Sequence, residues 1–354
     1  MRVLAITGTS DRSEIGLFCG LKQAGVELKV ILDPDSPYLS ILEESGVATT
    51  RAAFRRRFCF GSLKFLKEEL RLFNPEIMHA FTSRALSHAL LLKGKRNVVA
   101  YRGTSGHLSR LNPWHWLTYF NPALCKIICV SNSVRKYLLS SGLPESKLAV
   151  VYKGHDQKWY ADSRQASLDE FGIPSGAKVI CCIANMRPVK GVQYLIEAFS
   201  MIDRAEVFLL LVGEVRDKNL IDRANASPAA DCIKFAGYRK DSASILRASS
   251  IFVMPSIDRE GLPKAMIEAV MADVPLVVTN VGGMPEIIRN NIDGLVVPPK
   301  DSRTLAAALK RLLEDSKQAQ DFADSARQRA NELLSVECMV NATRDIYESL
   351  LRSK

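Results

Sequence analysis

Short runs of apolar, mostly β-branched residues alternate with helix-like segments along the whole 354-residue chain. Most of these runs are continuously apolar, which is typical of parallel strands that helices cover on both faces. The runs lie at 3–6, 28–32, 77–80, 98–101, 127–130, 148–151, 179–183, 207–212, 233–235, 251–254, 276–279 and 295–297. The pattern predicts an α/β fold made of Rossmann-like, doubly wound parallel sheets.

The length of the chain favours two domains, because single cores rarely grow beyond about 250–300 residues. The stretch 152–178 is polar, contains Ser, Asp and Gly and has no strand pattern, so we place the domain boundary within it. We expect one domain over 1–155 and a second over 156–338. Because ligands bind at the carboxyl ends of the strands in such sheets, we expect the two domains to face each other across a cleft.

Basic residues are concentrated in the first half of the chain. Residues 1–160 hold 23 Lys and Arg against 12 Asp and Glu, a net charge of +11. The rest holds 25 against 26, a net charge of −1, and the two parts give the +10 of the whole chain. The first half is therefore expected to meet an acidic partner: anionic lipid, nucleic acid or a phosphorylated acceptor.

Cysteine usage and the N-terminus predict a cytoplasmic protein. The eight cysteines form no C-x-x-C pair, and several lie inside apolar runs, as reduced core residues do. Only four apolar residues lie between Arg2 and Thr7, too few for a signal peptide. No apolar run approaches the roughly 20 residues of a membrane span.

The stretch 252–299 carries most of the chemical information. A buried-strand run is followed by Glu260-Gly261, and Glu268 lies eight residues later on an apolar helix pattern. The next strand run ends in Gly282-Gly283, three residues before Glu286, which either caps its own helix or contacts a ligand. Carboxylates at a helix start, beside glycines that expose backbone N–H groups, suit a polyhydroxylated and phosphorylated ligand.

The spacing of these two carboxylates resembles the E-x7-E signature of family 4 glycosyltransferases. Other segments resemble the same family in the same order, at 130–138, 151–156, 183–191, 211–214, 235–237 and 335–337. Within 151–156, Lys153 replaces the Asn that relatives carry. The resemblance covers nearly the whole chain and implies the two-domain GT-B architecture. It also implies a final helix, 339–354, that packs back on the N-terminal, acceptor-side domain, while 156–338 binds the nucleotide sugar.

The resemblance implies roles for both motif carboxylates. Glu268 is expected to accept hydrogen bonds from the ribose hydroxyls of the donor, and Glu260 from hydroxyls of the transferred sugar. Backbone amides of Gly261 and Leu262 would add donors nearby. The nucleotide would further contact the strand ends at Gly213, Gly237 and Tyr238.

Two cations on one loop predict a diphosphate site. Arg187 and Lys190 precede the helix pattern of 192–200, so two positive charges and a helix N-terminus would meet the leaving diphosphate. Many relatives carry the Arg where this chain has Asn185, which makes Lys190 the firmer assignment. No D-x-D motif accompanies them, so we predict neither a metal site nor a cofactor, and the nucleotide sugar is a substrate.

The N-terminal domain departs from the family pattern. Relatives carry a His just after the fourth strand, where it touches the donor sugar, and this chain has Arg102 there. His107 and His79 are the alternatives for that contact. The loop 7–16 is not a G-x-G-x-x-G loop, which argues against a dinucleotide oxidoreductase.

The run 51–73 interleaves basic residues with aromatic ones, and 114–120 is a second aromatic cluster, a candidate lid on the acceptor side. Such a run favours contact with an anionic membrane surface or an anionic acceptor. Phe65, Leu66 and Leu70 lie at helical spacing and are equally consistent with core packing. No nucleic-acid motif accompanies the basic charge, so we predict no nucleic-acid partner.

The sequence therefore predicts a metal-independent, retaining glycosyltransferase, peripheral on the inner face of the cell membrane, that modifies a cell-envelope glycan or glycolipid. A nucleotide-sugar epimerase of the same fold and a catalytically silent sugar-nucleotide or membrane-binding protein are the alternatives. The donor base and sugar, the acceptor, the linkage and the oligomeric state are left open.

Overall fold

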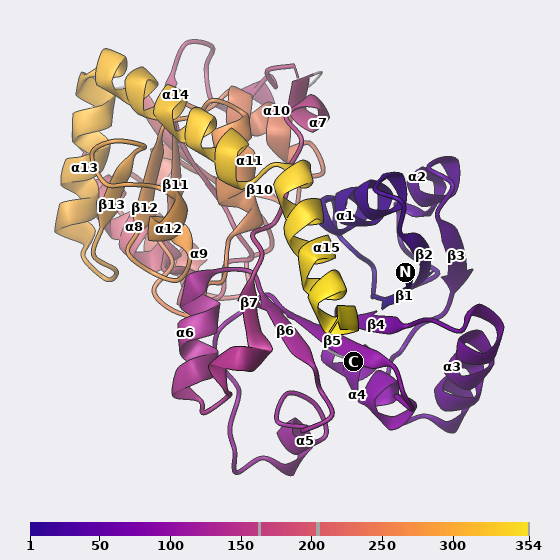
Figure 1. Cartoon of the computed structure of the whole chain (residues 1–354). Helices are drawn as coiled ribbons and strands as arrows, with labels where there is room; N and C mark the ends of the chain where they lie inside the picture. Colours follow the sequence, from indigo (N-terminus) through magenta and orange to yellow (C-terminus); the bar gives the residue numbers. More distant parts are fainter. Residues whose placement is uncertain (162–163, 203–205, 353–354) are drawn as a thin grey trace. The chain divides into compact units, whose positions relative to one another are not determined.

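The computed structural model describes residues 1–161, 164–202 and 206–352. It divides into two compact units (Figure 1). Unit 1 contains residues 1–155 together with the C-terminal segment from Leu333, and unit 2 contains residues 156–332. The last segment returns to unit 1 six residues earlier than the sequence analysis places it.

Unit 1 is built on a seven-stranded parallel sheet with the order β3-β2-β1-β4-β5-β6-β7. Its strands are β1 (Arg2–Ile6), β2 (Glu27–Leu32), β3 (Ala48–Arg51), β4 (Ile77–Ala80), β5 (Asn97–Arg102), β6 (Lys126–Cys129) and β7 (Leu148–Val150). Its helices are α1 (Arg12–Gln23), α2 (Leu39–Glu44), α3 (Phe60–Phe73), α4 (Ser83–Leu91), α5 (Pro113–Trp116), α6 (Asn132–Ser140) and α15 (Val336–Arg352). The order reverses at β1, whose neighbours are β2 and β4.

Three helices of unit 1 begin just beyond strands because a polar side chain caps each of them. The side chains of Asp11, Thr82 and Ser131 accept hydrogen bonds from backbone N–H groups in the first turns of α1, α4 and α6. Such caps satisfy N–H groups that have no partner within the helix. The starts of these helices therefore lie at the carboxyl edge of the sheet.

Helix α15 belongs to the core of unit 1 and lies beside α1 (Figure 1). Met339, Val340 and Tyr347 on α15 share one apolar cluster with Phe18 of α1. Gly20 permits the close approach, because a Cβ at this position would overlap a methyl group of Val340.

The backbone also ties the returning segment to unit 1. The His155 N–H donates to the Leu334 carbonyl over 2.6 Å, and His155 pairs with Ser335 in a parallel bridge. These bonds explain why the C-terminal segment joins unit 1 near Leu333, ahead of residue 339, where the sequence analysis places its start.

Unit 2 is built on a six-stranded parallel sheet with the order β10-β9-β8-β11-β12-β13. Its strands are β8 (Lys178–Ile183), β9 (Val207–Val212), β10 (Ile233–Gly237), β11 (Ile251–Met254), β12 (Leu276–Thr279) and β13 (Leu295–Val297). Its helices are α7 (Lys158–Ala161), α8 (Val192–Ser200), α9 (Asn219–Asn225), α10 (Ser242–Arg247), α11 (Lys264–Met271), α12 (Met284–Ile287), α13 (Ser302–Glu314) and α14 (Ser316–Leu333).

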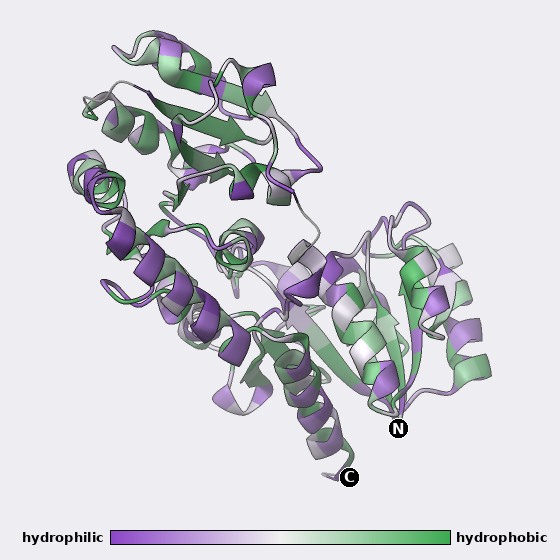
Figure 2. Cartoon of the chain, turned by 90° about the horizontal axis from the view of Figure 1, so that it is seen from above, coloured by the Kyte–Doolittle hydropathy of each residue, from purple (hydrophilic) through white to green (hydrophobic). Residues whose placement is uncertain are grey.

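The strands of both sheets are largely apolar, whereas the helices alternate apolar and polar faces (Figure 2). Every strand predicted from the sequence is present, and the predicted fold class of two doubly wound parallel-sheet units is confirmed. Strand β3 was not predicted, because it is a partly exposed edge strand with the sequence Ala-Thr-Thr-Arg. An edge strand of this kind has no continuous apolar run.

Candidate functional site

The unit 2 sheet has a topological switch point at β8. From β8 the chain winds to β9 on one side and, after β10, returns to β11 on the other. In open α/β sheets ligands bind outside the carboxyl ends of the strands at this point. The loops 184–191 and 255–263, which follow β8 and β11, therefore form the candidate site of unit 2, called here the switch-point site.

Gly191 brings these two loops together. Its φ is +70°, and a Cβ at this position would overlap the carbonyl oxygen of Pro255. The Ile257 N–H donates to the Val189 carbonyl over 2.9 Å. Only glycine combines this backbone conformation with such a close approach.

The loops place Lys190 against Glu260. The Lys190 ammonium forms an ion pair with Glu260 Oε1, and both side chains are largely buried. Ser256 Oγ donates to the same oxygen over 2.7 Å. The sequence-predicted diphosphate residue and the first motif carboxylate therefore meet in one cluster at the switch point. Arg187, the second predicted cation, is exposed at the start of the same turn.

The loop after β12 supports this cluster. Gly282 has a φ of +63°, and a Cβ there would lie 2.6 Å from the Glu260 Cβ and would overlap its carbonyl oxygen. The Gly283 N–H donates to the Gly261 carbonyl over 2.7 Å. Glu286 lies in the first turn of α12, which begins after Gly283. The Gly282-Gly283 pair thus holds the Glu260 loop from the other side.

Glu268 is buried on α11, with 8% of its surface exposed. Its carboxylate pairs with Lys264 on the preceding turn, 3.1 Å away. A buried carboxylate requires a compensating partner, and this cation comes from its own helix. Gly261 and Leu262 are also buried, just before the helix. The predicted ribose contact of Glu268 remains a prediction.

The loops after β9 and β10 reach the loop after β8. Gly213 has a φ of +126°, and a Cβ there would overlap the Ala184 carbonyl oxygen. Its N–H donates to the Gly237 carbonyl over 2.7 Å. Tyr238, which follows Gly237, is 75% exposed, so its ring is accessible for stacking on a flat ligand.

In the part of the chain that the structure describes, no three His, Cys, Asp or Glu side chains gather in a metal-binding group. Lys190 and Lys264 supply the positive charges that pair with Glu260 and Glu268.

The predicted donor-contact residues of unit 1 have different environments. The Arg102 guanidinium donates to the carbonyls of Thr104 and Gly106 at 2.9 and 2.5 Å and lies 4.9 Å from the Tyr119 ring. These contacts hold the loop after β5. His107 is exposed on that loop, with a φ of +59°.

His79 lies in the interior of unit 1, which corrects the expectation that it faces the ligand. Only 1% of its surface is exposed, and its Nδ1 lies 2.6 Å from the Tyr347 hydroxyl on α15. Burial lowers its pKa to about 3, so the ring is neutral. Sequence spacing placed His79 at a strand end, but the returning helix α15 covers that end.

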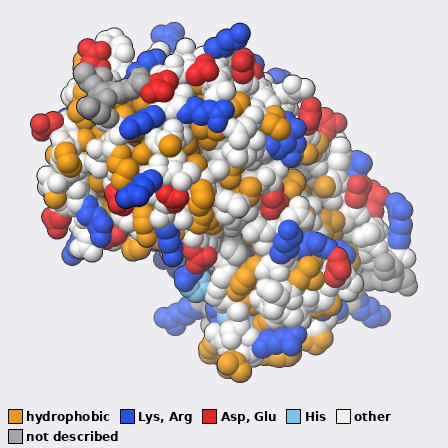
Figure 3. Space-filling model, turned by 90° about the vertical axis from the view of Figure 1, so that its left-hand side faces the viewer, with side chains coloured by type: hydrophobic (Ala, Val, Ile, Leu, Met, Phe, Trp, Pro, Cys, Tyr) orange, Lys and Arg blue, Asp and Glu red, His pale blue; other side chains and the backbone are white. Residues whose placement is uncertain are grey.

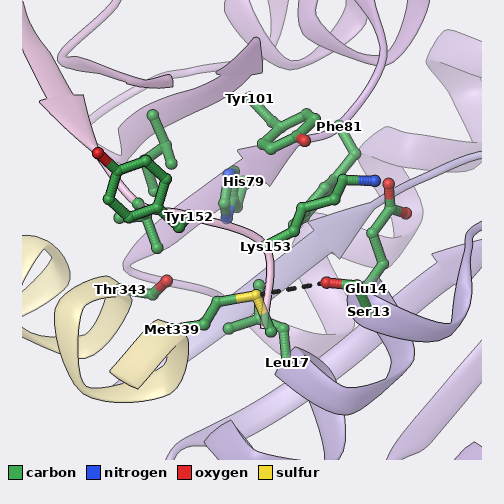
Figure 4. Close-up of a pocket in the computed structure, with 12 residues that line it drawn as sticks. Ser13, Glu14, Leu17, His79, Phe81, Tyr101, Tyr152, Lys153, Met339 and Thr343 are labelled. Carbon is green, nitrogen blue, oxygen red and sulfur yellow. Dashed lines mark hydrogen bonds between the residues drawn. The ribbon is translucent and has the colours of Figure 1, made fainter. Parts of the chain in front are cut away.

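A charged cluster that the sequence did not predict lies beside His79, around a narrow cavity of about 20 Å³ (Figure 4). Lys153 points its ammonium toward Glu14 and forms an ion pair with Asp11, the cap of α1. Thr7 Oγ1 donates to Glu14 Oε2 over 2.8 Å. The only sequence signal was Lys153 itself, at a position where the family pattern has Asn.

The pKa of Glu14 is raised to about 7. Burial is the largest cause, and the neighbouring Asp11 carboxylate adds to it, while Lys153 and the hydrogen bonds from Thr7 and Ser10 oppose it. Glu14 therefore holds its proton in the folded protein at pH values where the unfolded chain has released it. Its contribution to stability is largest below pH 4.5 and falls as pH rises toward 7.

We expect Glu14→Gln to remove this pH dependence. The wild-type protein should lose about 2–3 kcal/mol of unfolding free energy between pH 4.5 and pH 8 through Glu14. Urea unfolding of the whole chain at pH 4 and pH 8 measures this loss. The free energy of unfolding of Glu14→Gln should exceed that of wild type at pH 8 and should equal it at pH 4. Glu27→Gln, an exposed carboxylate on β2, is the control. Equal pH dependence in wild type and Glu14→Gln would contradict the assignment.

The run 51–73 divides into a buried part and an exposed part. Leu66 and Leu70 are buried, so the core-packing alternative is correct for them, whereas Phe65 is only half-buried. Phe54, which that alternative did not include, is also buried. Phe58 and Phe60 are exposed, the latter to 91%.

The exposed part joins the second aromatic cluster. The Phe58 ring lies 5.8 Å from that of Trp114, which is itself half-exposed, as is Trp116. We call the four aromatic residues Phe58, Phe60, Trp114 and Trp116, together with Arg56, the aromatic-basic patch. On the face of the molecule in Figure 3, basic, acidic and hydrophobic side chains are mixed. No helix among the described residues is both long and apolar enough to span a membrane.

The two units match two family profiles. The profile described as Glycosyltransferase Family 4 matches residues 16–159, and the one described as Glycosyl transferases group 1 matches residues 163–329. The two matches together cover most of the chain.

Similar proteins include curated relatives and solved structures. The N-acetyl-alpha-D-glucosaminyl L-malate synthase of Bacillus anthracis is 27% identical over 59% of this chain, and that match spans only 55% of the synthase. The lipopolysaccharide core biosynthesis glycosyltransferase LpsE of Rhizobium meliloti (strain 1021) is 26% identical over 98% of this chain and 96% of its own length. Anabaena HepE in complex with UDP-glucose superposes with a TM-score of 0.78 at 19% identity, covering 99% of this chain and 100% of HepE.

Two doubly wound parallel-sheet units of this kind define the GT-B class of glycosyltransferase folds. The matches of both units and of the relatives show that the chain belongs to glycosyltransferase family 4, as the E-x7-E motif predicts.

Proposed function

We propose that this protein transfers a sugar, with retention of its anomeric configuration, from a nucleoside-diphosphate donor to a hydroxyl of a cell-envelope glycan or glycolipid. The observation that carries the proposal is the Lys190–Glu260 pair at the switch point of unit 2. The family membership and the name of LpsE support the reaction class and the kind of acceptor.

In this reaction the bond between the anomeric carbon and the donor diphosphate breaks, and the acceptor oxygen forms a new bond to the same carbon. The nucleoside diphosphate leaves with the bonding electron pair, and its departing oxygen takes the proton that the acceptor hydroxyl gives up. Lys190 stabilises the negative charge that grows on the diphosphate, with Arg187 as a second cation. Because side chains supply this charge, we include metal independence in the proposal.

Glu260 has a double role in the proposal. The contacts that described residues make with its carboxylate use Oε1, so Oε2 remains for a hydroxyl of the transferred sugar. Its bond with Lys190 keeps that cation in place before the donor binds, which reduces reorganisation in the transition state.

The nucleoside would lie along the strand ends of unit 2, between Glu268 and the exposed ring of Tyr238. The solved structure of HepE contains UDP-glucose, which supports a nucleotide sugar as the donor.

Donor turnover tests the proposal. The protein is incubated with a panel of nucleotide sugars, with and without extracted cell-envelope glycolipids, and release of nucleoside diphosphate is measured. We expect acceptor-dependent release with at least one donor. Conversion of the donor to its epimer without release would favour the epimerase instead. Binding of a donor without any turnover would identify a catalytically silent protein.

We further propose that the aromatic-basic patch attaches unit 1 to an anionic membrane surface. Exposed Phe60 and Phe58 can insert between headgroups, and each nearby basic residue adds about 1 kcal/mol of attraction. Arg57 lies 5.9 Å from the Trp114 ring and adds charge at the same place.

The protein should sediment with phosphatidylglycerol vesicles at low salt and remain in solution with phosphatidylcholine vesicles. Combining Arg56→Ser with Phe58→Ser and Phe60→Ser should abolish sedimentation, whereas Lys22→Ser, which removes a charge elsewhere on unit 1, should not. Wild-type protein that stays in the supernatant with phosphatidylglycerol would remove this surface from the proposal.

A further inference from the structure

A pocket of about 480 Å³ lies at the carboxyl edge of the unit 1 sheet. Its lining comes from the loops after β1, β2 and β3 and from the start of α4. Strand β1 lies between β2 and β4, so the pocket sits at the switch point of this sheet. Its volume is in the range of small-molecule sites.

Basic side chains outnumber acidic ones in the lining of the pocket, although Arg55 also lies 3.9 Å from the Asp35 carboxylate. Arg55, Arg57 and Arg84 line it, and Asp33 is the acidic residue in the lining. The Asp33 carboxylate also accepts the Asp35 N–H over 3.1 Å. Several guanidinium groups around one pocket match the oxygens of a phosphate, because each can donate two parallel hydrogen bonds.

Backbone groups add to the positive potential. Thr82 caps α4, whose nine residues begin with Ser83 and carry no acid in the first turn. The positive end of this helix dipole lies at the pocket, where Thr82 and Ser83 belong to its lining. Gly8 at the end of β1 brings backbone without a side chain to the same pocket.

The loop that carries two of the arginines is anchored. Ser87 of α4 donates to the Arg57 carbonyl over 2.7 Å. Phe54 is buried in the lining, with its ring 5.1 Å from that of His88. The backbone that carries Arg55 and Arg57 is therefore held against α4, beside an apolar part of the lining.

We propose that this arginine pocket binds a phosphate group carried by the acceptor, so that the acceptor is a phosphorylated sugar, polyol or lipid headgroup. The proposal rests on the proposed function, because it deepens the acceptor class of the same enzyme. Some of the basic residues of unit 1 would then bind a phosphate group, in addition to those that contact a membrane surface.

Calorimetric titration with glycerol 3-phosphate, with glycerol as the uncharged comparison, tests the pocket. Wild-type protein should bind the phosphate and ignore glycerol. Arg57→Gln and Arg84→Gln should each weaken binding at least about tenfold, since hydrogen bonds to charged groups are at stake. Lys22→Gln removes one charge from exposed surface at the end of α1 and should change nothing.

Arg84→Lys separates specific binding from misfolding and from charge alone. It keeps the charge but loses the two-pronged donor, so binding should fall between wild type and Arg84→Gln. Equal affinity for glycerol and glycerol 3-phosphate, or unchanged affinity in both Gln variants, would overturn the proposal.

Sedimentation with phosphatidylcholine vesicles that contain phosphatidate distinguishes a lipid headgroup from a soluble phosphorylated acceptor. This experiment follows if the Gln variants lose affinity for glycerol 3-phosphate in the calorimetric titration. A lipid headgroup is then supported if glycerol 3-phosphate competes with the vesicles and if Arg84→Gln sediments less than wild type. Unchanged sedimentation supports a soluble phosphorylated acceptor. Nucleoside-diphosphate binding by unit 2 should be unaffected by Arg84→Gln. If wild type binds glycerol 3-phosphate but no nucleoside diphosphate, the proposed function fails while the pocket stands.

Discussion

Replacing Lys190 with Ala should lower the rate of sugar transfer by roughly 10²–10³-fold, as loss of one electrostatic transition-state contact does in other enzymes. Lys190 is the cation that the loop after β8 holds at the switch point, paired with Glu260. Initial rates at saturating donor measure the effect. Lys317→Ala removes an exposed charge at the start of α14 and should leave the rate unchanged.

The structure adds a stability effect to this variant. Removing Lys190 leaves the buried Glu260 carboxylate with Ser256 as its remaining described partner, so the unfolding midpoint should also fall. Lys190→Met combined with Glu260→Gln removes both charges and should restore the midpoint without restoring the rate. A double variant that recovers normal turnover would show that Lys190 serves only to neutralise Glu260.

Gly282→Ala should destabilise unit 2 by more than about 2 kcal/mol and reduce transfer severely. The backbone at Gly282 has a φ of +63°, which costs a residue with a Cβ about 1–2 kcal/mol. The new methyl group would also displace Glu260, whose Cβ lies only 2.6 Å from its ideal position. Denaturant unfolding and initial rates measure the two effects.

Gly172→Ala is the matched control for this prediction. Gly172 has a φ of +68°, but the nearest atom to an added Cβ is the end of Lys234, 3.7 Å away. This variant should show the conformational cost alone and normal transfer. Similar losses of stability in both variants would contradict the crowding at Gly282.

Much of the fold could be predicted from the sequence because parallel strands leave a strong signal. Each buried strand is a continuous apolar run, and polar caps such as Ser131 mark the starts of helices. Strand β3 escaped because partial exposure at a sheet edge allows Ala-Thr-Thr-Arg to pair without an apolar run.

The contacts within the sites were harder to predict. The E-x7-E spacing selected Glu260 and Glu268, but the pairing of Glu260 with Lys190 joins residues 70 positions apart. That pairing depends on the backbone conformations of Gly191 and Gly282, which spacing along the chain does not reveal.

Unit 1 departed further from expectation for a similar reason. His79 follows the pattern of a strand end that faces a ligand, yet α15 returns from more than 250 residues away and covers it. The ion pair of Lys153 with Asp11 also depends on tertiary structure, although the substitution at Lys153 marked the place. Within the run 51–73, some apolar side chains are buried in the core and others are exposed. Composition alone could not predict which residues belong to each group.

The central claim is that the switch-point site of unit 2 binds the nucleoside diphosphate of the donor. Calorimetric titration of wild type and Glu268→Gln with UDP, GDP, ADP and inorganic diphosphate tests it most directly. At least one nucleoside diphosphate should bind wild type, and Glu268→Gln should weaken it about tenfold through the lost ribose contact while leaving inorganic diphosphate unchanged. Absence of binding by any nucleoside diphosphate, or equal affinity in the two proteins, would contradict the account.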